Sequence, residues 1–518
     1  MKTYYSLIIL TFSSFFISCS ESELNTTNAV VELNPVEIAN KEFHSELAGF
    51  KDTTMLFFYS ANDNRLLWLD DSLKLNSRAK ELLKFIENIG SYGLNQKHYV
   101  SEKQLSLLSI NSKDTLLTST MLKLARNLRW SDFSFESEQN PFTKAEINEL
   151  DFISKISNDF QSSSIYELLE GCQPKHHQYR SIVDALKRYV LRTKISKKKI
   201  KVPSNKQDSA NFMSFVARAL VIHGLIDSTD VDNTILTNAI KRFQQEHGLN
   251  QDGVVGRKTA KLLSKSPYDY YLTAVLSLDK WRQKETWAKS RIEINIPEYR
   301  LRYYENGKQL RTHKVIVGNV KAQTIEILDS VEYLVVYPYW YVPRSIINHE
   351  MLPKARKDST YFRRKGFELL SGKKVVDSDK INYKKSFRYT VRQKGGSSNA
   401  LGLVKFIFPN PSSIYLHDTP TKHLFKKEIR AFSHDCIRLQ DPLDLAYSVL
   451  ENDGSSYSSE KVKELISLKE RKRINLKSKL PIFVHYTLAS AKDSLIVFNE
   501  DVYSREKKSI KKLRKIFK

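Results

Sequence analysis

The chain has 518 residues, of which 41% are hydrophobic and 27% are charged, so it is long enough for two or three domains with their own cores. Gly and Pro are scarce, at 16 and 14 residues, which excludes a fibrous or a broadly disordered chain. Lys and Arg number 83 against 58 for Asp and Glu, a net charge of +25 that favours an anionic partner. The sequence has no zinc-finger spacing, no aromatic RNA-binding signature and no P-loop, so we do not expect that partner to be nucleic acid.

The first residues have the layout of a secretory signal. Lys2 is followed by an apolar run over residues 7–16 and then by small residues. The run ends in "FISC", which resembles the bacterial lipobox. That resemblance implies that Cys19 is acylated and that residues 1–19 are a lipoprotein signal peptide. A plain signal peptide or one short membrane helix is the alternative. Polar residues 20–42 would then form a tether.

Residues 43–200 have a helical pattern and are predicted to form a scaffold domain. "SRAKELLKFIENIG", "TSTMLKLARNLRW" and "SIVDALKRYVLR" each place apolar residues on one stripe. Cys172 precedes His176 and His177, but adjacent histidines point apart and no second ligand pair is near, so we expect no metal site. We also expect no disulfide between Cys172 and Cys436.

Residues 210–264 are predicted to be a compact unit of three helices. In "AIKRFQQEHGLNQDGVVGRKTAKLL" a glycine ends the second helix and "DGVVG" forms a tight turn. This string resembles the peptidoglycan-binding type 1 domain, which implies that the unit binds peptidoglycan. The resemblance rests on Phe243, Gln244, Gly248, Leu249, Asp252, Gly253, Gly256 and Thr259.

After a helix near 268–290, the pattern changes to strands. "RIEINIPEYRLRYYENGKQLRTHKVIVG" alternates apolar and polar residues around an "ENGK" hairpin turn. Residues 291–450 are therefore predicted to form a largely β domain. Within it, a very basic segment at about 342–390 is predicted to be a helical insertion.

Residues 451–518 are expected to pack on the scaffold and to end in a basic tail. Ile510, Leu513 and Ile516 have helical spacing in that tail. A solvated helix and a helix that touches an anionic lipid or glycan surface both fit this pattern.

One cysteine has the surroundings of a nucleophile. His417 ends an alternating strand, and Cys436 follows 436 − 417 = 19 residues later. A cysteine nucleophile needs a base, because the thiolate is the reactive form, and histidine titrates near neutrality. His417 and His434 both fit that role, so a Cys/His acyl-transfer enzyme is favoured over a buried thiol.

The segment "IYLHDTPTKHLFKKEIRAFSHDCIRLQDPLDLA" resembles the active-site segment of the L,D-transpeptidases with a YkuD-type catalytic domain. "NIPEYRLRYYENGK", "YPYWYVPRSI" and "NALGLVKFIFPN" are similar to their long, YcbB-like form. The resemblance implies a multidomain α+β fold: a helical scaffold, a three-helix peptidoglycan-binding module, and a mainly-β catalytic domain with a helical capping insertion.

The resemblance also implies roles for individual residues. Cys436 would be the nucleophile and His417 the general base and proton donor, oriented by the backbone carbonyl of Asp418. Backbone N–H groups around Cys436 would form an oxyanion hole. The residues that would shape the substrate and oxyanion region are Ser433, His434, Asp435, Arg438, Tyr415 and Trp340. No metal or organic cofactor is implied.

The implied reaction releases D-Ala from tetrapeptide stems and forms 3→3 cross-links in peptidoglycan. Alternatives are L,D-carboxypeptidase action, D-amino-acid exchange or protein attachment on the same acyl-enzyme, or a non-catalytic peptidoglycan-binding anchor. The family implies acylation by carbapenems. We expect a monomeric lipoprotein of the cell envelope. No Asp follows Cys19, which fits sorting to the outer membrane, and we expect it to face the periplasm; the sequence leaves open which membrane and which face.

One residue departs from the family pattern, which has glycine before the cysteine where this chain has Asp435. Glycine there suggests a positive φ, which aspartate tolerates better than most residues. A carboxylate beside the thiol should disfavour the thiolate. We therefore expect an active enzyme with a retuned cysteine.

Overall fold

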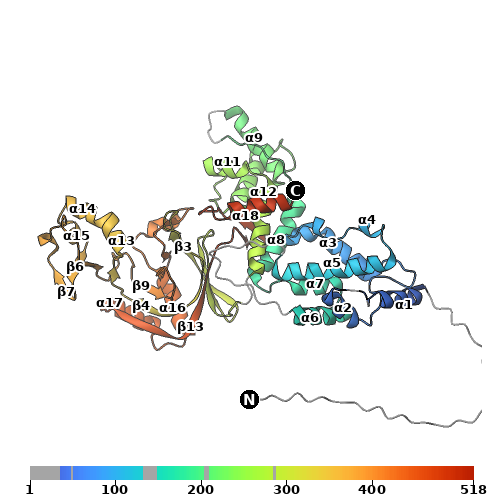
Figure 1. The fold of residues 1–518 in the computed structure, drawn as a ribbon. Helices are drawn as coiled ribbons and strands as arrows, with labels where there is room; N and C mark the ends of the chain where they lie inside the picture. Colours follow the sequence, from blue (N-terminus) through green and yellow to red (C-terminus); the bar gives the residue numbers. More distant parts are fainter. Residues whose placement is uncertain are drawn as a thin grey trace, which may run out of the picture.

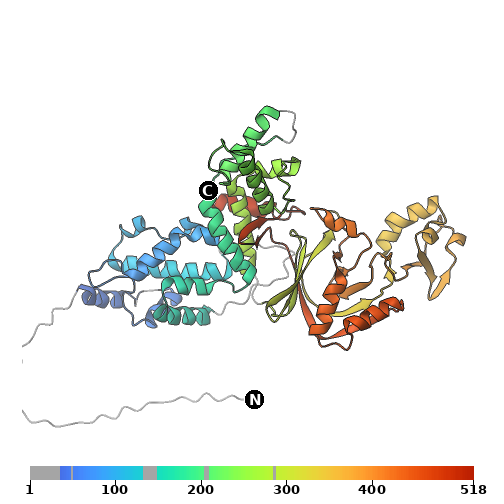
Figure 2. The ribbon, with the colours of Figure 1, turned by 180° about the vertical axis from the view of Figure 1, so that it is seen from behind.

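The computed structural model describes residues 35–47, 49, 51–131, 133, 149–203, 209–283 and 287–518. The helical scaffold, the small helical module and the β domain lie side by side in that order of the chain, with the insertion at the far end of the β domain (Figures 1 and 2). Among the described residues, no helix is long and apolar enough to cross a membrane. Cys19 lies outside the described residues.

The scaffold is a mainly helical layer around one large core. Its buried side chains come from the N-terminal helices, from α12 and from the C-terminal segment, so the last residues of the chain complete the first domain. Its elements are α1 (Pro35–Leu47), α2 (Thr53–Ser60), α3 (Ser77–Glu87), η1 (Ile89–Tyr92), η2 (Gln96–His98), α4 (Glu102–Leu105), α5 (Ile110–Trp130), α6 (Glu149–Ser162), α7 (Ile165–Cys172), α8 (His177–Thr193), α12 (Pro267–Arg282), β14 (Ala489–Lys492), β15 (Leu495–Phe498) and α18 (Lys507–Ile516).

Helix α1 shortens the expected tether. Residues 35–42 were predicted to be tether, but they form the first turns of α1. Ala39, Phe43 and Leu47 are buried at a spacing of four, which is one stripe of a helix. The prediction was wrong because this period becomes visible only past residue 42. The rest of the tether, residues 20–34, lies outside the described residues.

The apolar stripe of the basic tail packs on the scaffold, while its basic side chains stay exposed. Leu513 of α18 is fully buried, and Ile510 and Ile516 pack against the scaffold core. The stripe at helical spacing covers α12, and because the basic face stays exposed, a solvated helix and a helix that touches an anionic surface both stay predictions.

The small module has the three helices that the sequence predicts: α9 (Ser209–Ile222), α10 (Asn233–Glu246) and α11 (Arg257–Leu263). Gln244 is buried, and its side-chain amide donates to the carboxylate of Asp252 at 2.7 Å and accepts from the N–H of Gly253 at 2.9 Å. Gly248 and Gly253 have φ of 62° and 74°. These motif residues therefore fold the turn between α10 and α11, and the structure gives them a role in folding.

The β domain is a nine-stranded mixed sheet in the order β11-β3-β12-β10-β9-β4-β13-β1-β2, and β3 also pairs with β2, so the sheet closes on itself. Its core is made by the inward side chains of the strands and by two helices. The elements are β1 (Arg291–Asn295), β2 (Arg300–Glu305), β3 (Lys308–Gly318), β4 (Ile327–Val336), β9 (Val404–Ile407), β10 (Leu416–His417), η5 (Lys422–Lys426), β11 (Ala431–Ser433), β12 (Ile437–Leu439), α16 (Pro442–Asn452), α17 (Ser459–Ser467) and β13 (Lys472–His485).

The catalytic sheet extends beyond the predicted boundary at residue 450. Strand β13 pairs antiparallel with β4 and parallel with β1, so it is an interior strand of the sheet. Residues 472–485 were predicted to belong to a scaffold-packing segment. That prediction was wrong for this strand, which lies inside the sheet of the β domain. Parallel pairing with a strand nearly 200 residues earlier leaves no local signal in the sequence.

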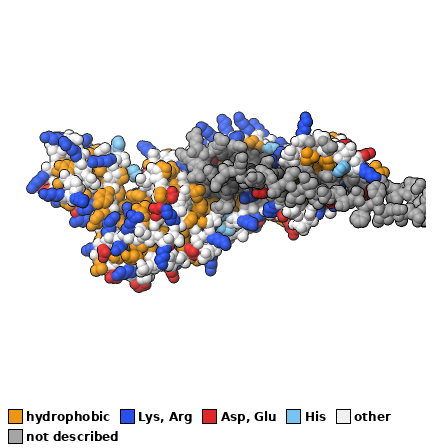
Figure 3. Space-filling view, turned by 60° about the horizontal axis from the view of Figure 1, so that its bottom comes forward, with side chains coloured by type: hydrophobic (Ala, Val, Ile, Leu, Met, Phe, Trp, Pro, Cys, Tyr) orange, Lys and Arg blue, Asp and Glu red, His pale blue; other side chains and the backbone are white. Residues whose placement is uncertain are grey.

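The insertion is mixed where the sequence predicts helices. It has its own core and a four-stranded sheet in the order β5-β8-β6-β7. Its exposed basic side chains, including Lys354, Arg356 and Arg363, cover the end of the molecule (Figure 3). The elements are β5 (Trp340–Tyr341), α13 (Arg344–Ile346), η3 (Ile347–Met351), α14 (Leu352–Lys357), α15 (Tyr361–Arg364), β6 (Phe367–Ser371), β7 (Lys374–Val376), η4 (Ser378–Lys380) and β8 (Thr390–Gln393).

Candidate active site

Two adjacent strands bring the candidate nucleophile and base together. β10 and β12 run parallel, with His417 opposite Arg438. The N–H of Ile437 donates to the carbonyl of Tyr415 at 3.2 Å, which fixes the start of this pairing. Side chains alternate between the two faces of a sheet, so Cys436, just before β12, shares a face with Tyr415 and His417. Cys436 and His417 thus lie on neighbouring strands, and Cys436 is two positions before Arg438, the residue that pairs with His417.

The imidazole of His417 is buried, with 5% of the residue exposed, and is held by the main chain. Its Nδ1 donates to the carbonyl oxygen of Asp418 at 2.5 Å, which leaves Nε2 as the basic nitrogen. Burial, and then the charge of Arg438, lower the pKa of His417 to about 3, although the carbonyls of Asp418 and Ala400 act in the opposite direction. The ring is therefore neutral at physiological pH and can accept a proton.

Asp418 is itself fixed by several contacts. Its buried carboxylate accepts from the N–H of Leu403 at 2.9 Å and from its neighbour Thr419 at 2.7 Å, and it pairs with Lys422. Gly402 packs directly against it: its φ is +57°, and a Cβ there would lie 2.3 Å from Cγ of Asp418. This position admits the carboxylate only because glycine has no side chain.

Cys436 is a free thiol of intermediate exposure. Burial raises the pKa of Cys436 to about 12, a backbone hydrogen bond from Tyr415 lowers it, and the carboxylate of Asp435 raises it further. The rings of Tyr415 and His417 lie 5.6 Å apart, centroid to centroid, and burial and then the charge of Cys436 raise the pKa of Tyr415. The resting site therefore holds a protonated thiol beside Tyr415 and a carboxylate.

The loop before Cys436 is tied to the end of β3. Asn319 donates to the carbonyl of Ser433 from its backbone N–H at 2.8 Å and from its side-chain amide at 2.9 Å. A Cβ on Gly318 would lie 2.3 Å from the carbonyl oxygen of His434. The two segments approach so closely that only glycine fits there.

Thr324 makes the second tie. Its hydroxyl donates to the carbonyl of Asp435 at 2.7 Å and accepts from the N–H of Gly318 at 2.8 Å. The φ of Asp435 is not positive, so the expectation of a left-handed backbone there was wrong. Aspartate fits this position without backbone strain, and its effect on the thiol is electrostatic.

His434 points away from the nucleophile and toward the insertion. Its Nε2 lies 2.7 Å from Oε1 of Glu350 in η3, and the two side chains are 50% and 47% exposed. Of the two histidines that the sequence offers as a base, only His417 has its ring fixed on the strand beside Cys436.

Two cations flank His417 across the sheet. Lys405 on β9 and Arg438 on β12 each pair in register with it. Nη1 of Arg438 donates to Oγ1 of Thr421 at 3.3 Å, while its buried Nε has no hydrogen-bond partner among the described residues. Burial lowers the pKa of both cations, so an anionic group beside them would be stabilised. Lys405 was not predicted as a site residue; its signal in the sequence is a charge that alternates with the buried Val404 and Phe406.

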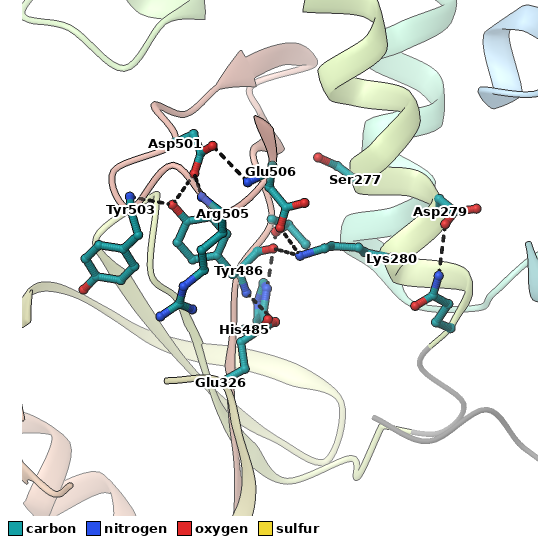
Figure 4. A network of polar contacts seen from close by, with 12 residues as sticks. Ser277, Asp279, Lys280, Glu326, His485, Tyr486, Asp501, Tyr503, Arg505 and Glu506 are labelled. Carbon is teal, nitrogen blue, oxygen red and sulfur yellow. Dashed lines mark hydrogen bonds and ion pairs between the residues drawn. The ribbon is translucent and has the colours of Figure 1, made fainter. Parts of the chain in front are cut away.

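A chain of polar contacts leads from α12 toward the segments that hold the loop before Cys436 (Figure 4). Lys280 of α12 pairs with Glu506, whose N–H donates to the carboxylate of Asp501 at 3.0 Å. The hydroxyl of Tyr486 donates to Asp501 at 2.6 Å and accepts from the N–H of Tyr503 at 3.0 Å.

Tyr503 and Arg505 end this chain at β3 and its loop. The Tyr503 hydroxyl donates to the carbonyl of Gly318 at 2.6 Å, and Nη2 of Arg505 donates to the carbonyl of Thr324 at 2.9 Å. The sequence analysis missed these residues because they follow Cys436 by more than sixty positions and belong to no motif. They join α12 to the residues that hold the nucleophile loop.

The remaining cysteine and its histidine neighbours have structural positions. Cys172 is buried and its Sγ donates to the carbonyl of Leu168 at 3.2 Å. His176 lies 2.7 Å from Glu293, at the junction of scaffold and β domain. Both cysteines in the described part of the chain are free, and there no three His, Cys, Asp or Glu side chains cluster as metal ligands would.

Three segments match known protein families. Residues 289–463 match the L,D-transpeptidase catalytic domain of YkuD type, residues 53–186 match a scaffold domain, and residues 215–263 match a domain described as "Putative peptidoglycan binding domain".

A protein of Haemophilus influenzae named "Putative L,D-transpeptidase" is 33% identical over 220 residues, which is 42% of this chain and 44% of that protein. The match thus spans less than half of that relative's length. Two solved structures are also similar. "Structure of the Ldtfm-avibactam carbamoyl enzyme" has 10% identity and a TM-score of 0.19 over 49% of this chain and 81% of that one. An L,D-transpeptidase from Xylanimonas cellulosilytica has 14% identity and a TM-score of 0.16 over 56% and 98%. Scores this low carry no argument about fold or function.

The family matches fall on the segments that the sequence motifs and the observed domains single out. The catalytic match includes the β10–β12 pair with His417 and Cys436, and the peptidoglycan-binding match covers most of α9 and all of α10 and α11. The chain therefore carries an L,D-transpeptidase catalytic domain of the YkuD family, joined to a helical scaffold and a type 1 peptidoglycan-binding domain.

Proposed function

We propose that this protein is a cysteine-dependent L,D-transpeptidase of the cell envelope that acts on the peptide stems of peptidoglycan. The observation that carries the proposal is the β10–β12 pairing, with Cys436 and His417 on one face and the imidazole bonded to the Asp418 carbonyl. The matches to a catalytic and a peptidoglycan-binding domain support the substrate class.

In the proposed reaction, Sγ of Cys436 attacks the carbonyl carbon of the third stem residue while its proton passes to His417. The amide bond to the terminal D-Ala then breaks, and His417 gives the proton to the departing amine. A thioester remains on Cys436. An amine of a second stem attacks the thioester, its proton returns through His417 to the sulfur, and a 3→3 cross-link is released.

Charge that develops on the stem carbonyl needs hydrogen-bond donors beside the sulfur. The N–H of Ile437 is committed to the Tyr415 carbonyl. We therefore assign the oxyanion to the N–H of Cys436 and to the hydroxyl of Tyr415, which lies across the β10–β12 pairing from Cys436. Arg438 and Lys405 would hold a carboxylate of the stem, because both are partly desolvated cations beside the base.

The location follows from the same substrate. A peptidoglycan-acting protein works in the envelope, and the exposed basic side chains of the insertion suit an anionic polymer (Figure 3). Acylation of Cys19 would anchor the chain to the outer membrane. Retention of radiolabelled palmitate by the full chain, and its loss in Cys19→Ala, tests that anchor.

Intact-protein mass spectrometry tests the proposed chemistry. The protein, without residues 1–34, is mixed with a soluble disaccharide-tetrapeptide. We expect an adduct with the mass of the stem less D-Ala, no adduct in Cys436→Ala, and an unchanged adduct in the matched control Cys172→Ala. His417→Gln should slow the adduct by about 100-fold or more, the usual contribution of a general base.

The products distinguish the alternatives. An adduct that decays only to tripeptide points to L,D-carboxypeptidase action, and exchange of D-Ala for an added D-amino acid points to the exchange reaction. If the wild type forms no adduct but still binds sacculi, the protein is a peptidoglycan-binding anchor and the proposal fails.

A further inference from the structure

A pocket of about 670 Å³ lies where the peptidoglycan-binding module meets α12 and the C-terminal segment. We name it the junction pocket. The elements α11, α12 and α18 converge there, beside the C-terminus (Figure 1). Its wall includes His247, Lys265, Asp269, Glu500, Lys507 and Lys511. The catalytic residues are not part of this wall.

Every acidic side chain of the wall already has a partner. Glu500 pairs with Lys258 and with Lys261, each at 3.8 Å. The other acids are bound as well. Their pairs are Asp269 with Arg514, Asp501 with the hydroxyl of Tyr486, and Glu506 with Lys280.

Three lysines of the pocket wall form no ion pair with a described carboxylate. Lys265, Lys507 and Lys511 have no carboxylate within ion-pair distance in the described part of the chain. Burial and the charge of Lys261 lower the pKa of Lys265, while Glu500, Asp269 and Asp501 act in the opposite direction. All three lysines are exposed, so they form a cationic rim that an anionic ligand can reach from solvent.

The wall also contains a buried acceptor. His247 is 7% exposed, and its Nδ1 donates to the carbonyl of Phe243 at 2.7 Å. Its Nε2 has no hydrogen-bond partner among the described residues. With the proton on Nδ1, Nε2 accepts, so it needs an N–H or O–H donor. A ligand that fits this pocket therefore carries both anionic groups and hydrogen-bond donors.

We infer that the junction pocket binds a peptide stem of peptidoglycan through its carboxylates, as a second site distinct from the catalytic one. A stem supplies carboxylates for the lysines and amide N–H groups for His247, whereas a phosphate diester supplies no donor. The inference rests on the proposed substrate class. It extends peptidoglycan binding beyond residues 215–263 to α12 and α18, which the matched domain does not include.

Lysine footprinting tests the site locally. The full chain carrying Cys436→Ala, which prevents turnover, is acetylated with and without soluble disaccharide-tetrapeptide, and labelling is read by mass spectrometry. The ligand should slow labelling of Lys265, Lys507 and Lys511. It should leave Lys508 and Lys515 unchanged, since both lie on α18 outside the pocket wall.

A matched pair of variants measures the contribution of the charges. In the same Cys436→Ala background, Lys507→Ala with Lys511→Ala should raise the dissociation constant of the second site about tenfold, as expected for lost charge-assisted hydrogen bonds. Lys508→Ala with Lys515→Ala removes the same charge from the same helix and should change it by less than about twofold, because both lysines lie outside the pocket wall.

Several results would overturn the inference. These are equal affinity in the two variant pairs, unchanged footprints, full binding of a stem with amidated carboxylates, competition by millimolar inorganic phosphate, or vesicles of anionic phospholipid binding through the same lysines. Cross-linking by the wild-type protein is measured separately. Loss of the footprint with cross-linking intact refutes only the second site, and a footprint without cross-linking refutes only the proposed function.

Discussion

Cys436 and His417 meet as two neutral groups. Burial raises the pKa of Cys436 to about 12, and burial with the charge of Arg438 lowers the pKa of His417 to about 3. A thiolate–imidazolium pair is therefore scarce in the resting enzyme. In the proposed reaction the proton would therefore move as the sulfur attacks, with His417 as the base in the transition state.

The first prediction concerns the pH dependence of the thiol. Alkylation of Cys436 by iodoacetamide should keep rising with pH through pH 10 without a plateau, because the thiolate fraction grows until the pKa is reached. Asp435→Asn removes the neighbouring negative charge at nearly constant size and should lower the pKa.

The measurement is the second-order alkylation rate of Cys436 from pH 6 to 11, followed by peptide mass spectrometry in a Cys172→Ala background. Asp435→Glu keeps the charge and serves as the control. A plateau below pH 8 in the wild type, or an Asp435→Asn profile identical to the wild type, would contradict this account of the site.

At the scale of single residues, the sequence pointed to the chemistry but not to its tuning. The spacing of His417 and Cys436 and the surrounding motif predicted that the two residues share a site, and the structure places them on adjacent strands. The positive φ expected at Asp435 is not there, since the family glycine does not by itself reveal which constraint selects it. Lys405 was missed because its role comes from pairing across β9 and β10.

At the scale of elements, the nucleophile loop depends on the segment after β3. Thr324 bonds at once to the carbonyl of Asp435 and to the N–H of Gly318. Thr324→Val keeps the shape and leaves both buried groups unpaired. We expect kcat to fall about tenfold or more with KM little changed, because small misplacements of a nucleophile have large effects on rate.

Thr324→Ser keeps the hydroxyl and should retain near-normal kcat, which makes it the matched control. Steady-state kinetics of adduct formation and thermal unfolding of both variants separate a positioning role from a folding role. Equal rates for the two variants, at equal stability, would show that the hydroxyl does not position Cys436.

Gly402 provides a second element-scale prediction. Gly402→Ala places a methyl group 2.3 Å from Cγ of Asp418, while Gly372→Ala, at a similar φ of +60°, meets nothing within 4 Å. Both changes carry the backbone cost of a positive φ, about 1 kcal/mol. Only Gly402→Ala should also displace the residue that orients His417, and so lose activity by about 100-fold.

Denaturant unfolding and adduct kinetics check this pair. Similar activity in the two alanine variants would mean that the contact between Gly402 and Asp418 does not matter for the base.

Turn chemistry of this kind was partly predictable: the "DGVVG" turn of the small module was recognised from sequence. The role of Gly402 was not, because it depends on Asp418, sixteen residues further along the chain.

At the scale of the whole molecule, buried ion pairs join scaffold and catalytic domain. Glu293 of β1 lies 2.7 Å from His176 and 2.5 Å from Arg291, and the His176 ring packs against the rings of Trp281 and Trp287. Burial acts to raise the pKa of Glu293, but His176 and Arg291 lower it to about 2. The charged form is thus favoured by folding.

The sign of the pH dependence follows from that shift. A carboxyl whose pKa falls on folding contributes stability above its ordinary value, near 4.5, and the contribution is lost as the pH falls toward 2. Glu293→Gln should destabilise the junction by about 3 kcal/mol at pH 7, because it leaves Arg291 buried without its counter-ion. The loss of stability between pH 4.5 and 2 should become shallower.

Tryptophan fluorescence during urea unfolding reports this region, since Trp281 and Trp287 flank His176. Glu332→Gln, which breaks an exposed pair with Lys479, is the control and should change stability by less than about 1 kcal/mol. An unchanged midpoint in Glu293→Gln at pH 7 would contradict the assigned role.

The order of the domains along the chain was predictable from changes in period and composition, whereas their mutual packing was not. β13 returns to the middle of the catalytic sheet, and residues 501–506 join α12 to the nucleophile loop (Figure 4). Contacts of this kind link residues up to about two hundred positions apart and depend on the folded geometry.

One measurement tests the central claim most directly: muropeptide analysis of tetrapeptide-rich sacculi incubated with the protein lacking residues 1–34, and with its Cys436→Ala variant. The account predicts new tetra–tri dimers with 3→3 linkage and release of D-Ala for the wild type, and neither product for Cys436→Ala. Dimers formed equally by both proteins, or no change in sacculi that the wild type still binds, would contradict it.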